Sequence, residues 1–300
     1  MAVTAAQVKE LRDRTGAGMM ECKKALVETA GDMDAAIDQL RKSGLAQADK
    51  KASRVAAEGK IALAVSADGK QAVMVEVNCE TDFVAKDGNF NAFADAVAAN
   101  ALQHGSPDVA ALMLTSLDGS TVEEARQALV AKIGENVQVR RFESKSTDGF
   151  LGSYIHSGKI GVLVELAGGS TELARDLAMH VAALNPKYVA EQDVPAEFIA
   201  KEKEILVARA EQENELATAE GKGKSIDIIE KKVAGQLRKN LAGITLHGQP
   251  FVKDGDVQVA KLLEQNKAKV VGFCRLAVGE GIEKQESNFA DEVMQQVRGG

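Results

Sequence analysis

Hydrophobic positions in the first 43 residues recur at the three- and four-residue spacing of amphipathic helices. The first such stretch, residues 4–15, opens with Thr4 and has Gln7 three positions later, which is the pattern of a capping box. Glycines at positions 16, 18 and 31 separate it from two further stretches. We therefore predict a module of three short helices. Because so small a bundle is marginally stable alone, it should lean on another part of the chain.

After a charge- and alanine-rich linker at residues 45–59, which could be helical, the hydrophobic period changes to two. IALAV and AVMVEV alternate on either side of the turn at residues 67–70, and the Asp-Gly pair in that turn predicts a β-hairpin. Next come two helical patterns, the second at residues 122–133, and a strand at 137–142. The first helix has an apolar face made of Phe90, Phe93, Ala94, Val97 and Ala101.

The same order of elements then returns. YIHSGKIGVLVEL, residues 154–166, is a second hairpin, and a shift of 89 residues places Gly69 on Gly158 and Glu76 on Glu165. Helical patterns follow at residues 172–184 and 257–265, and a strand follows at 269–276. We infer that an antiparallel α+β unit has been duplicated, so the fold class is α+β.

The second copy is interrupted by a charge-dense helical segment at residues 195–240. Its two limbs flank EGKGKSID, which predicts an antiparallel helical hairpin. A last helical pattern contains Phe289, Val293, Met294 and Val297. The expected division is 1–55 for the helical module with its linker, 56–145 for core unit 1, 146–190 with 241–280 for core unit 2, 191–240 for the hairpin and 281–300 for a C-terminal module.

Composition narrows the class of partner. The chain has 37 basic and 44 acidic residues, a net charge of −7, and no Trp, so neither the charge nor the aromatic content expected of a nucleic-acid binder is present. The N-terminus lacks an apolar signal region, and no run of residues is apolar enough to span a bilayer. We expect a cytoplasmic protein that binds neither nucleic acid nor membranes.

Cysteines, histidines and glycine motifs give no sign of a cofactor or a metal site. Cys22, Cys79 and Cys274 are isolated, and we expect them to be small buried hydrophobic residues. Position 218 is Thr where a phosphate loop ending at Lys224 needs Gly, so this stretch is expected to be the tip of the hairpin. The four histidines lack metal-ligand spacing.

Two of the histidines have different expected roles. His180 lies on an apolar helical face, which favours a hydrogen-bonded core histidine over a ligand. His156 ends a strand beside a tight turn, where a side chain faces solvent or a partner.

The stretch VNCETDFVAKDGNF, residues 77–90, contains an unexpectedly long connection. Twelve residues separate Val77 from Phe90, whereas the second copy needs about five, at 167–171. Long connections on a rigid scaffold tend to be functional, and this one carries Asp82 beside Phe83. The alternative is that Phe83 folds back onto its own helix as a hydrophobic staple.

Five blocks, in order, resemble the bacterial elongation factor Ts family, the nucleotide exchange factors of elongation factor Tu. They are LRDRTGAGMMECKKAL, VNCETDFVAKDGNF, GSYIHSGKIGVLVEL, LHGQPFV and GFCRLAVGEGIEK, and the resemblance covers residues 4 to about 293. It implies an N-terminal three-helix module of the ubiquitin-associated (UBA-like) type, a two-part core, an inserted helical hairpin and a C-terminal helical module.

The resemblance also implies a mechanism and site residues. A family member binds elongation factor Tu with GDP bound, and also in its nucleotide-free form, and promotes GDP release so that GTP can bind. Residues Thr81, Asp82, Phe83 and Val84 match the element that disturbs the Mg²⁺ site, with the aromatic ring inserted between helices of the GTPase domain. Such a protein has no active site of its own and needs no cofactor.

Other contacts follow from the same resemblance. The N-terminal and C-terminal modules would grip the GTPase domain, with Lys23 as a contact, and core unit 2 with His156 would meet a β-barrel domain. Cys274, Leu276 and Asn288 depart from the family pattern, which affects the expected C-terminal contacts. Whether two complexes associate through the helical hairpin, as a dimer of heterodimers, stays open.

Two rival hypotheses belong to other classes. One is an enzyme that uses Cys79 beside Glu80, although no base lies near them in the sequence. The other is an RNA-associated ribosomal factor, which the acidic composition opposes.

Overall fold

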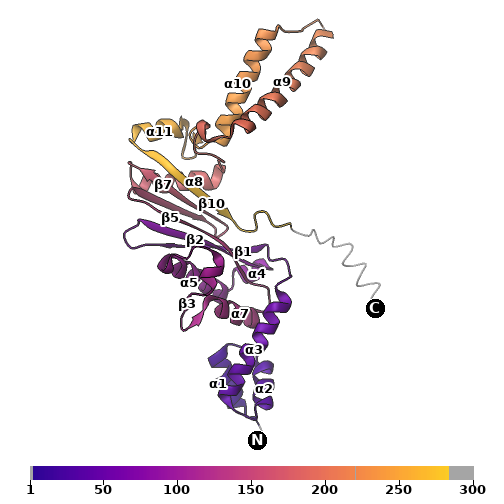
Figure 1. Ribbon diagram of the computed structural model, residues 1–300, viewed down its shortest axis with the longest axis vertical. Helices are drawn as coiled ribbons and strands as arrows, with labels where there is room; N and C mark the ends of the chain where they lie inside the picture. The colour runs from indigo at the N-terminus through magenta and orange to yellow at the C-terminus, as the bar shows by residue number, and fades with distance from the viewer. Residues whose placement is uncertain (1–2, 220, 284–300) are drawn as a thin grey trace. The chain divides into compact units, whose positions relative to one another are not determined.

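The computed structural model describes residues 3–219 and 221–283 (Figure 1). The chain forms two compact units. Of the described residues, the first unit combines 3–64, 73–143 and 276–283, and the second combines 65–72 with 144–219 and 221–275. The mixture of helices and small sheets confirms the α+β class.

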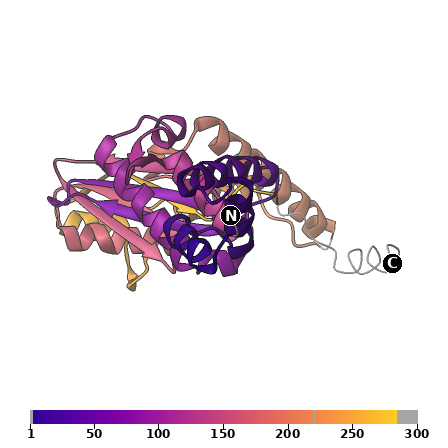
Figure 2. The same cartoon turned by 90° about the horizontal axis from the view of Figure 1, so that it is seen from below.

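The first unit begins with the three predicted helices, α1 (Ala5–Thr15), α2 (Met19–Glu28) and α3 (Met33–Lys51). They form one small bundle (Figure 2). Thr4 and Gln7 make the predicted capping box, and Gly16 ends α1 in the left-handed conformation. The buried side chains of the bundle are Val8, Leu11, Cys22, Ala25, Leu26 and Ala36.

Helix α3 is longer than the sequence pattern predicted, because it continues through half of the expected linker to Lys51. Residues 45–51 contain no Gly or Pro to stop it, and most of them have high helix propensity. The extension lets α3 pack against α7 (Val122–Ile133), where Gly44 faces the methyl group of Ala131. The bundle thus packs against the rest of the first unit through α3 and α7, as expected for so small a bundle.

One three-stranded sheet, whose strands lie mostly in the first unit, has the strand order β1 (Glu58–Val65), β2 (Gln71–Cys79), β5 (Gln138–Ser146). The predicted turn is present, with Gly69 left-handed. Helices α4 (Asp82–Ala85), α5 (Gly88–His104), α6 (Val109–Met113) and α7 and the short strands β3 (Ser116–Leu117) and β4 (Ser120–Thr121) complete the unit. The core includes Val75, Val77, Phe90, Val97 and Val130.

The second unit repeats this order of elements. Its sheet runs β6 (Phe150–His156), β7 (Ile160–Ala167), β10 (Lys269–Ala277), and β6 pairs antiparallel with β7. Helix α8 (Thr171–Leu184) approaches β6 so closely that a Cβ at Gly152 would overlap the backbone of Ala174. Helix α11 (Val259–Gln265) and the unpredicted strands β8 (Pro250–Phe251) and β9 (Asp254–Gln258) complete this layer.

The predicted helical hairpin is present in the second unit. A short 3₁₀ turn, η1 (Glu191–Asp193), precedes α9 (Ala196–Ala219), which pairs with α10 (Ile226–Ile244) (Figure 1). The second limb extends four residues beyond the predicted end at 240. Near the tip, the Asn214 side chain accepts the Lys224 backbone N–H at 2.7 Å, so this glycine-lysine stretch is a turn, as predicted.

His180 is the core histidine that the sequence pattern favoured. It is fully buried on α8, its Nε2 lies 2.9 Å from Gln249 Oε1, and its Nδ1 accepts the backbone N–H of Val252 at 3.2 Å. Because Nδ1 is an acceptor, the proton belongs on Nε2, which donates to Gln249. Burial lowers the pKa of His180, and the Gln249 bond opposes this only in part.

Acidification should therefore destabilise the second unit. Between about pH 7.5 and pH 5.5, around the usual histidine pKa of about 6.5, the unfolded chain binds a proton on His180 more readily than the folded chain does. The free energy of unfolding should fall by up to about 1.4 kcal/mol per pH unit for this histidine. Burial also lowers the pKa of His247, although the charge of Asp193 opposes this, so His247 adds to the pH dependence of stability.

Denaturant titrations across this pH window test the prediction. The His180→Gln variant should show a shallower dependence of unfolding free energy on pH than the natural chain, whatever its stability at pH 7.5. Parallel pH profiles for the two proteins would show that His180 does not carry the effect.

The cysteines are buried to different degrees. Cys22 and Cys79 are buried as expected, but Cys274 is half-buried, because the middle of β10 is only partly covered. The predicted C-terminal helix, with Phe289, Val293, Met294 and Val297, lies outside the described residues.

Two general features of the described residues bear on function. None of their helices combines the length and apolar character that crossing a membrane requires. Within residues 3–219 and 221–283, no three His, Cys, Asp or Glu side chains are grouped so that they could hold a metal ion.

Candidate functional site

The stretch that the sequence singled out begins where β2 ends at Cys79. The long connection contains a short helix, because residues 82–85 form the one-turn helix α4. Thr81 is the cap, since its hydroxyl accepts the backbone N–H of Val84 at 3.3 Å. Asp87 then caps α5 by accepting the N–H groups of Asn89 and Phe90. The two caps explain why the chain turns twice within ten residues.

Helix α4 divides its side chains between the core and solvent. Val84 and Ala85 pack against the hydrophobic core of the first unit. Phe83 points the other way and is 81% exposed. The alternative in which Phe83 staples its own helix is therefore wrong, because a side chain packed onto its helix would be covered. Among the described large hydrophobic residues Phe83 is the most exposed, and aromatic side chains are enriched at the centres of protein interfaces.

Asp82 lies beside Phe83 on the exposed side of α4. Its carboxylate accepts a hydrogen bond from Lys86 Nζ at 2.7 Å, one helical turn later. Both side chains are largely exposed, so the pair contributes little to stability and can be exchanged for contacts with a partner at low cost.

The structure adds a residue that the sequence analysis missed. Glu135, in the loop after α7, accepts the backbone N–H of Thr81 at 3.0 Å and its hydroxyl at 2.7 Å. Fifty-four positions separate the two residues, and nothing in a single sequence signals such a pairing.

The two other predicted contact residues lie on elements other than α4. Lys23 is exposed on α2, one turn from the exposed Met19 and Met20, which the sequence analysis did not select. His156 is exposed at the end of β6 in the second unit, and its Nδ1 lies 3.2 Å from the Tyr154 hydroxyl. Each of these residues is accessible on its own unit.

A buried carboxylate holds the end of the described chain. Glu76 on β2 is fully buried and accepts hydrogen bonds from Arg140, Arg141 and the backbone N–H of Gly279, at 3.0, 2.5 and 2.8 Å. Burial raises the pKa of Glu76, but these bonds and one from Asn78 together outweigh it and lower the pKa. The same arginines donate to the carbonyl groups of Ala277 and Glu280.

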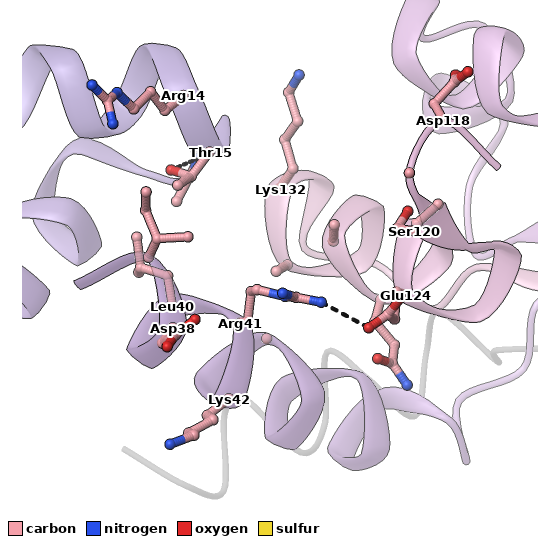
Figure 3. Close-up of a pocket in the computed structure, with 18 residues that line it drawn as sticks. Arg14, Thr15, Asp38, Leu40, Arg41, Lys42, Asp118, Ser120, Glu124 and Lys132 are labelled. Carbon is pink, nitrogen blue, oxygen red and sulfur yellow. Dashed lines mark hydrogen bonds and ion pairs between the residues drawn. The ribbon is translucent and has the colours of Figure 1, made fainter. Parts of the chain in front are cut away.

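Two other features of the first unit do not identify a catalytic site. A hollow of about 660 Å³ lies between α3 and α7, where Arg41 and Glu124 form a 2.7 Å ion pair (Figure 3). Its other charged residues are also of both signs, so it selects for no ligand charge. Cys79, the nucleophile of the rival enzyme hypothesis, is fully buried with its sulfur 3.2 Å from the Thr81 carbonyl oxygen, out of reach of a substrate.

Comparison with known proteins identifies the family. The family model described as elongation factor TS matches residues 80–280. The chain is 58% identical over 301 residues to elongation factor Ts of Thioalkalivibrio sulfidiphilus, covering 100% of both chains. It is 56% identical over 300 residues to that of Methylococcus capsulatus and 56% identical over 297 residues to that of Xanthomonas campestris, each covering 99% of both chains. The chain therefore belongs to the elongation factor Ts family.

Proposed function

We propose that this protein is a cytoplasmic guanine nucleotide exchange factor that binds elongation factor Tu with GDP bound and promotes GDP release during translation elongation. The observation that carries the proposal is Phe83, an exposed aromatic ring on the one-turn helix that follows β2. Inserted near the phosphates of the GTPase, this ring would displace groups that hold Mg²⁺. Because Mg²⁺ bridges phosphate and protein oxygens, its loss loosens the nucleotide without any covalent step.

The energetics require more than the ring. A 10⁴-fold acceleration of release corresponds to about 5.5 kcal/mol. Burying one phenylalanine side chain contributes about 1.5–3 kcal/mol. The remainder must come from a broad interface that holds the GTPase in a nucleotide-poor state. To the extent that the bound factor weakens the equilibrium binding of GDP, GDP weakens the binding of the factor by the same free energy.

We assign parts of this interface to the other predicted residues. Lys23, with Met19 and Met20, would contact the GTPase domain through the UBA-like N-terminal module, and His156 would contact a β-barrel domain through core unit 2. In this division the module ends near residue 55, and the hairpin at 191–240 is an insertion. Thr81, Asp82 and Val84 complete the element around Phe83, with Asp82 repelling phosphate, hydrogen-bonding to the partner or shaping the turn.

A release assay tests the proposal. Elongation factor Tu loaded with fluorescent GDP is mixed with this protein and an excess of unlabelled nucleotide, and the loss of fluorescence is followed. We expect the release rate to rise with the concentration of this protein and then to saturate. A rate that stays at its spontaneous value at every concentration, while chelation of Mg²⁺ still releases GDP, would overturn the proposed function.

A further inference from the structure

Where β2 passes into α4, two glutamate side chains each accept hydrogen bonds from the opposite segment. Glu135 Oε2 accepts the backbone N–H groups of Glu80 and Thr81 at 3.1 and 3.0 Å, and Oε1 accepts the Thr81 hydroxyl at 2.7 Å. In return, Glu80 Oε1 accepts the backbone N–H of Asn136 at 2.6 Å. The end of β2 and the loop after α7 are thus joined directly in front of α4.

Thr81 transmits this attachment to α4. Its hydroxyl hydrogen is used by Glu135, so a lone pair of the oxygen is left for the backbone N–H of Val84, the bond that caps the helix. A four-residue helix cannot form by its own hydrogen bonds, because nucleation costs more than one turn returns. The direction of Phe83, which lies within this turn, therefore depends on how firmly Thr81 is held.

The loop that supplies Glu135 is itself fixed. Gly134 ends α7 in the left-handed conformation, with φ of 87°. Asn136 is buried and donates from Nδ2 to the carbonyl oxygen of Arg54 at 2.8 Å. The residues on both sides of Glu135 are therefore fixed, so its carboxylate is held in place where it bonds Thr81.

We propose that Glu135 is a positioning residue for nucleotide exchange, which holds α4 so that Phe83 is presented ready for insertion. This inference rests on the proposed function. Without Glu135 the Phe83 ring is still available, but α4 must become ordered during binding. The free-energy cost of that ordering reduces the net free energy of binding. Loss of Glu135 should therefore cost less than loss of the ring itself, about tenfold in assisted release.

Hydrogen exchange on the isolated protein tests the structural part without a partner. Glu135→Ala should accelerate exchange of the backbone amides at residues 80–85. Glu135→Gln should restore part of the protection, because its amide oxygen can accept the two backbone N–H groups and its NH₂ can donate to Thr81. Asp108→Ala is the matched control: Asp108 accepts the N–H of Ala111 and caps the short helix α6 of the same unit. It should leave residues 80–85 protected.

The release assay tests the functional part. Glu135→Ala should slow assisted GDP release about tenfold, Glu135→Gln should be intermediate, and Asp108→Ala should match the natural chain. If Glu135 acts through Phe83, adding Glu135→Ala to Phe83→Ala should cause no further loss, whereas independent effects would multiply.

The outcomes separate this inference from the proposed function. If the natural chain does not accelerate GDP release from elongation factor Tu, the proposed function is overturned. If the natural chain and Glu135→Ala accelerate release equally, only the positioning role is overturned. A full additional loss in the double variant, or an equal loss in Asp108→Ala, would also overturn it, because the effect would then come from general destabilisation.

Discussion

Replacing Phe83 with alanine should slow assisted GDP release by about 10- to 100-fold, because the interface loses the 1.5–3 kcal/mol that burial of the ring contributes. The melting temperature of the free protein should hardly change, since the side chain is 81% exposed and the core beneath α4 is filled by Val84 and Ala85. Fluorescent GDP release and thermal unfolding of the same preparation measure the two quantities.

Leu114 provides a matched control for this substitution. It is 76% exposed and belongs to the same unit, so Leu114→Ala also removes a large apolar side chain from the surface. Assisted release should be unaffected by this change. If Phe83→Ala lowers the melting temperature by several degrees, or if both variants slow release equally, the specific role of the ring is wrong.

Replacing Glu76 should have the largest effect on stability. Glu76→Ala removes the acceptor shared by Arg140, Arg141 and the N–H of Gly279, and it leaves these donors without their buried partner. Breaking a buried ion pair typically costs about 3–5 kcal/mol. We expect a loss of about 3 kcal/mol in the free energy of unfolding, because both arginine side chains are partly exposed to water. Denaturant titration measures it.

The pH dependence gives a second signature of Glu76. Its folded pKa is lowered, so its contribution is fully present above the unfolded value of about 4.3 and is lost as the pH falls through the folded value. The stability difference between the natural chain and Glu76→Gln should therefore shrink in acid. Glu143→Ala, which changes an exposed glutamate on β5, should cost less than about 0.5 kcal/mol. A Glu76 variant as stable as this control would contradict the assignment.

The elements that could be predicted from the sequence are those with local signals. Thr4 with Gln7, the turn at residues 67–70 and the limbs around EGKGKSID each carry their pattern within a few positions, and each forms the expected element. The extent of α3 was missed, because a charged, alanine-rich stretch is compatible with both a linker and a helix. Packing of α3 on α7 decides between them, and packing is not visible in the pattern.

The candidate site could be located from the sequence but not built from it. The unequal length of the two copies pointed to Phe83, and the exposure of the ring excluded the staple alternative. The support of the site comes from far along the chain, since Glu135 bonds Thr81. Glu76 likewise holds a distant segment, because it bonds Gly279 near the end of the described chain. Such pairs depend on how distant segments meet, so a glutamate of this kind cannot be told from a solvated one in a single sequence.

If Phe83 loosens GDP by disturbing the Mg²⁺ site of elongation factor Tu, its effect on GDP release should depend on the bound metal. Release of fluorescent GDP from elongation factor Tu is followed with the natural chain and with Phe83→Ala, first in Mg²⁺ and then after chelation. We expect GDP release in Mg²⁺ to be faster with the natural chain than with Phe83→Ala, and the difference to close once the metal has been removed. Equal rates in Mg²⁺, or a difference that is unchanged by chelation, would contradict it.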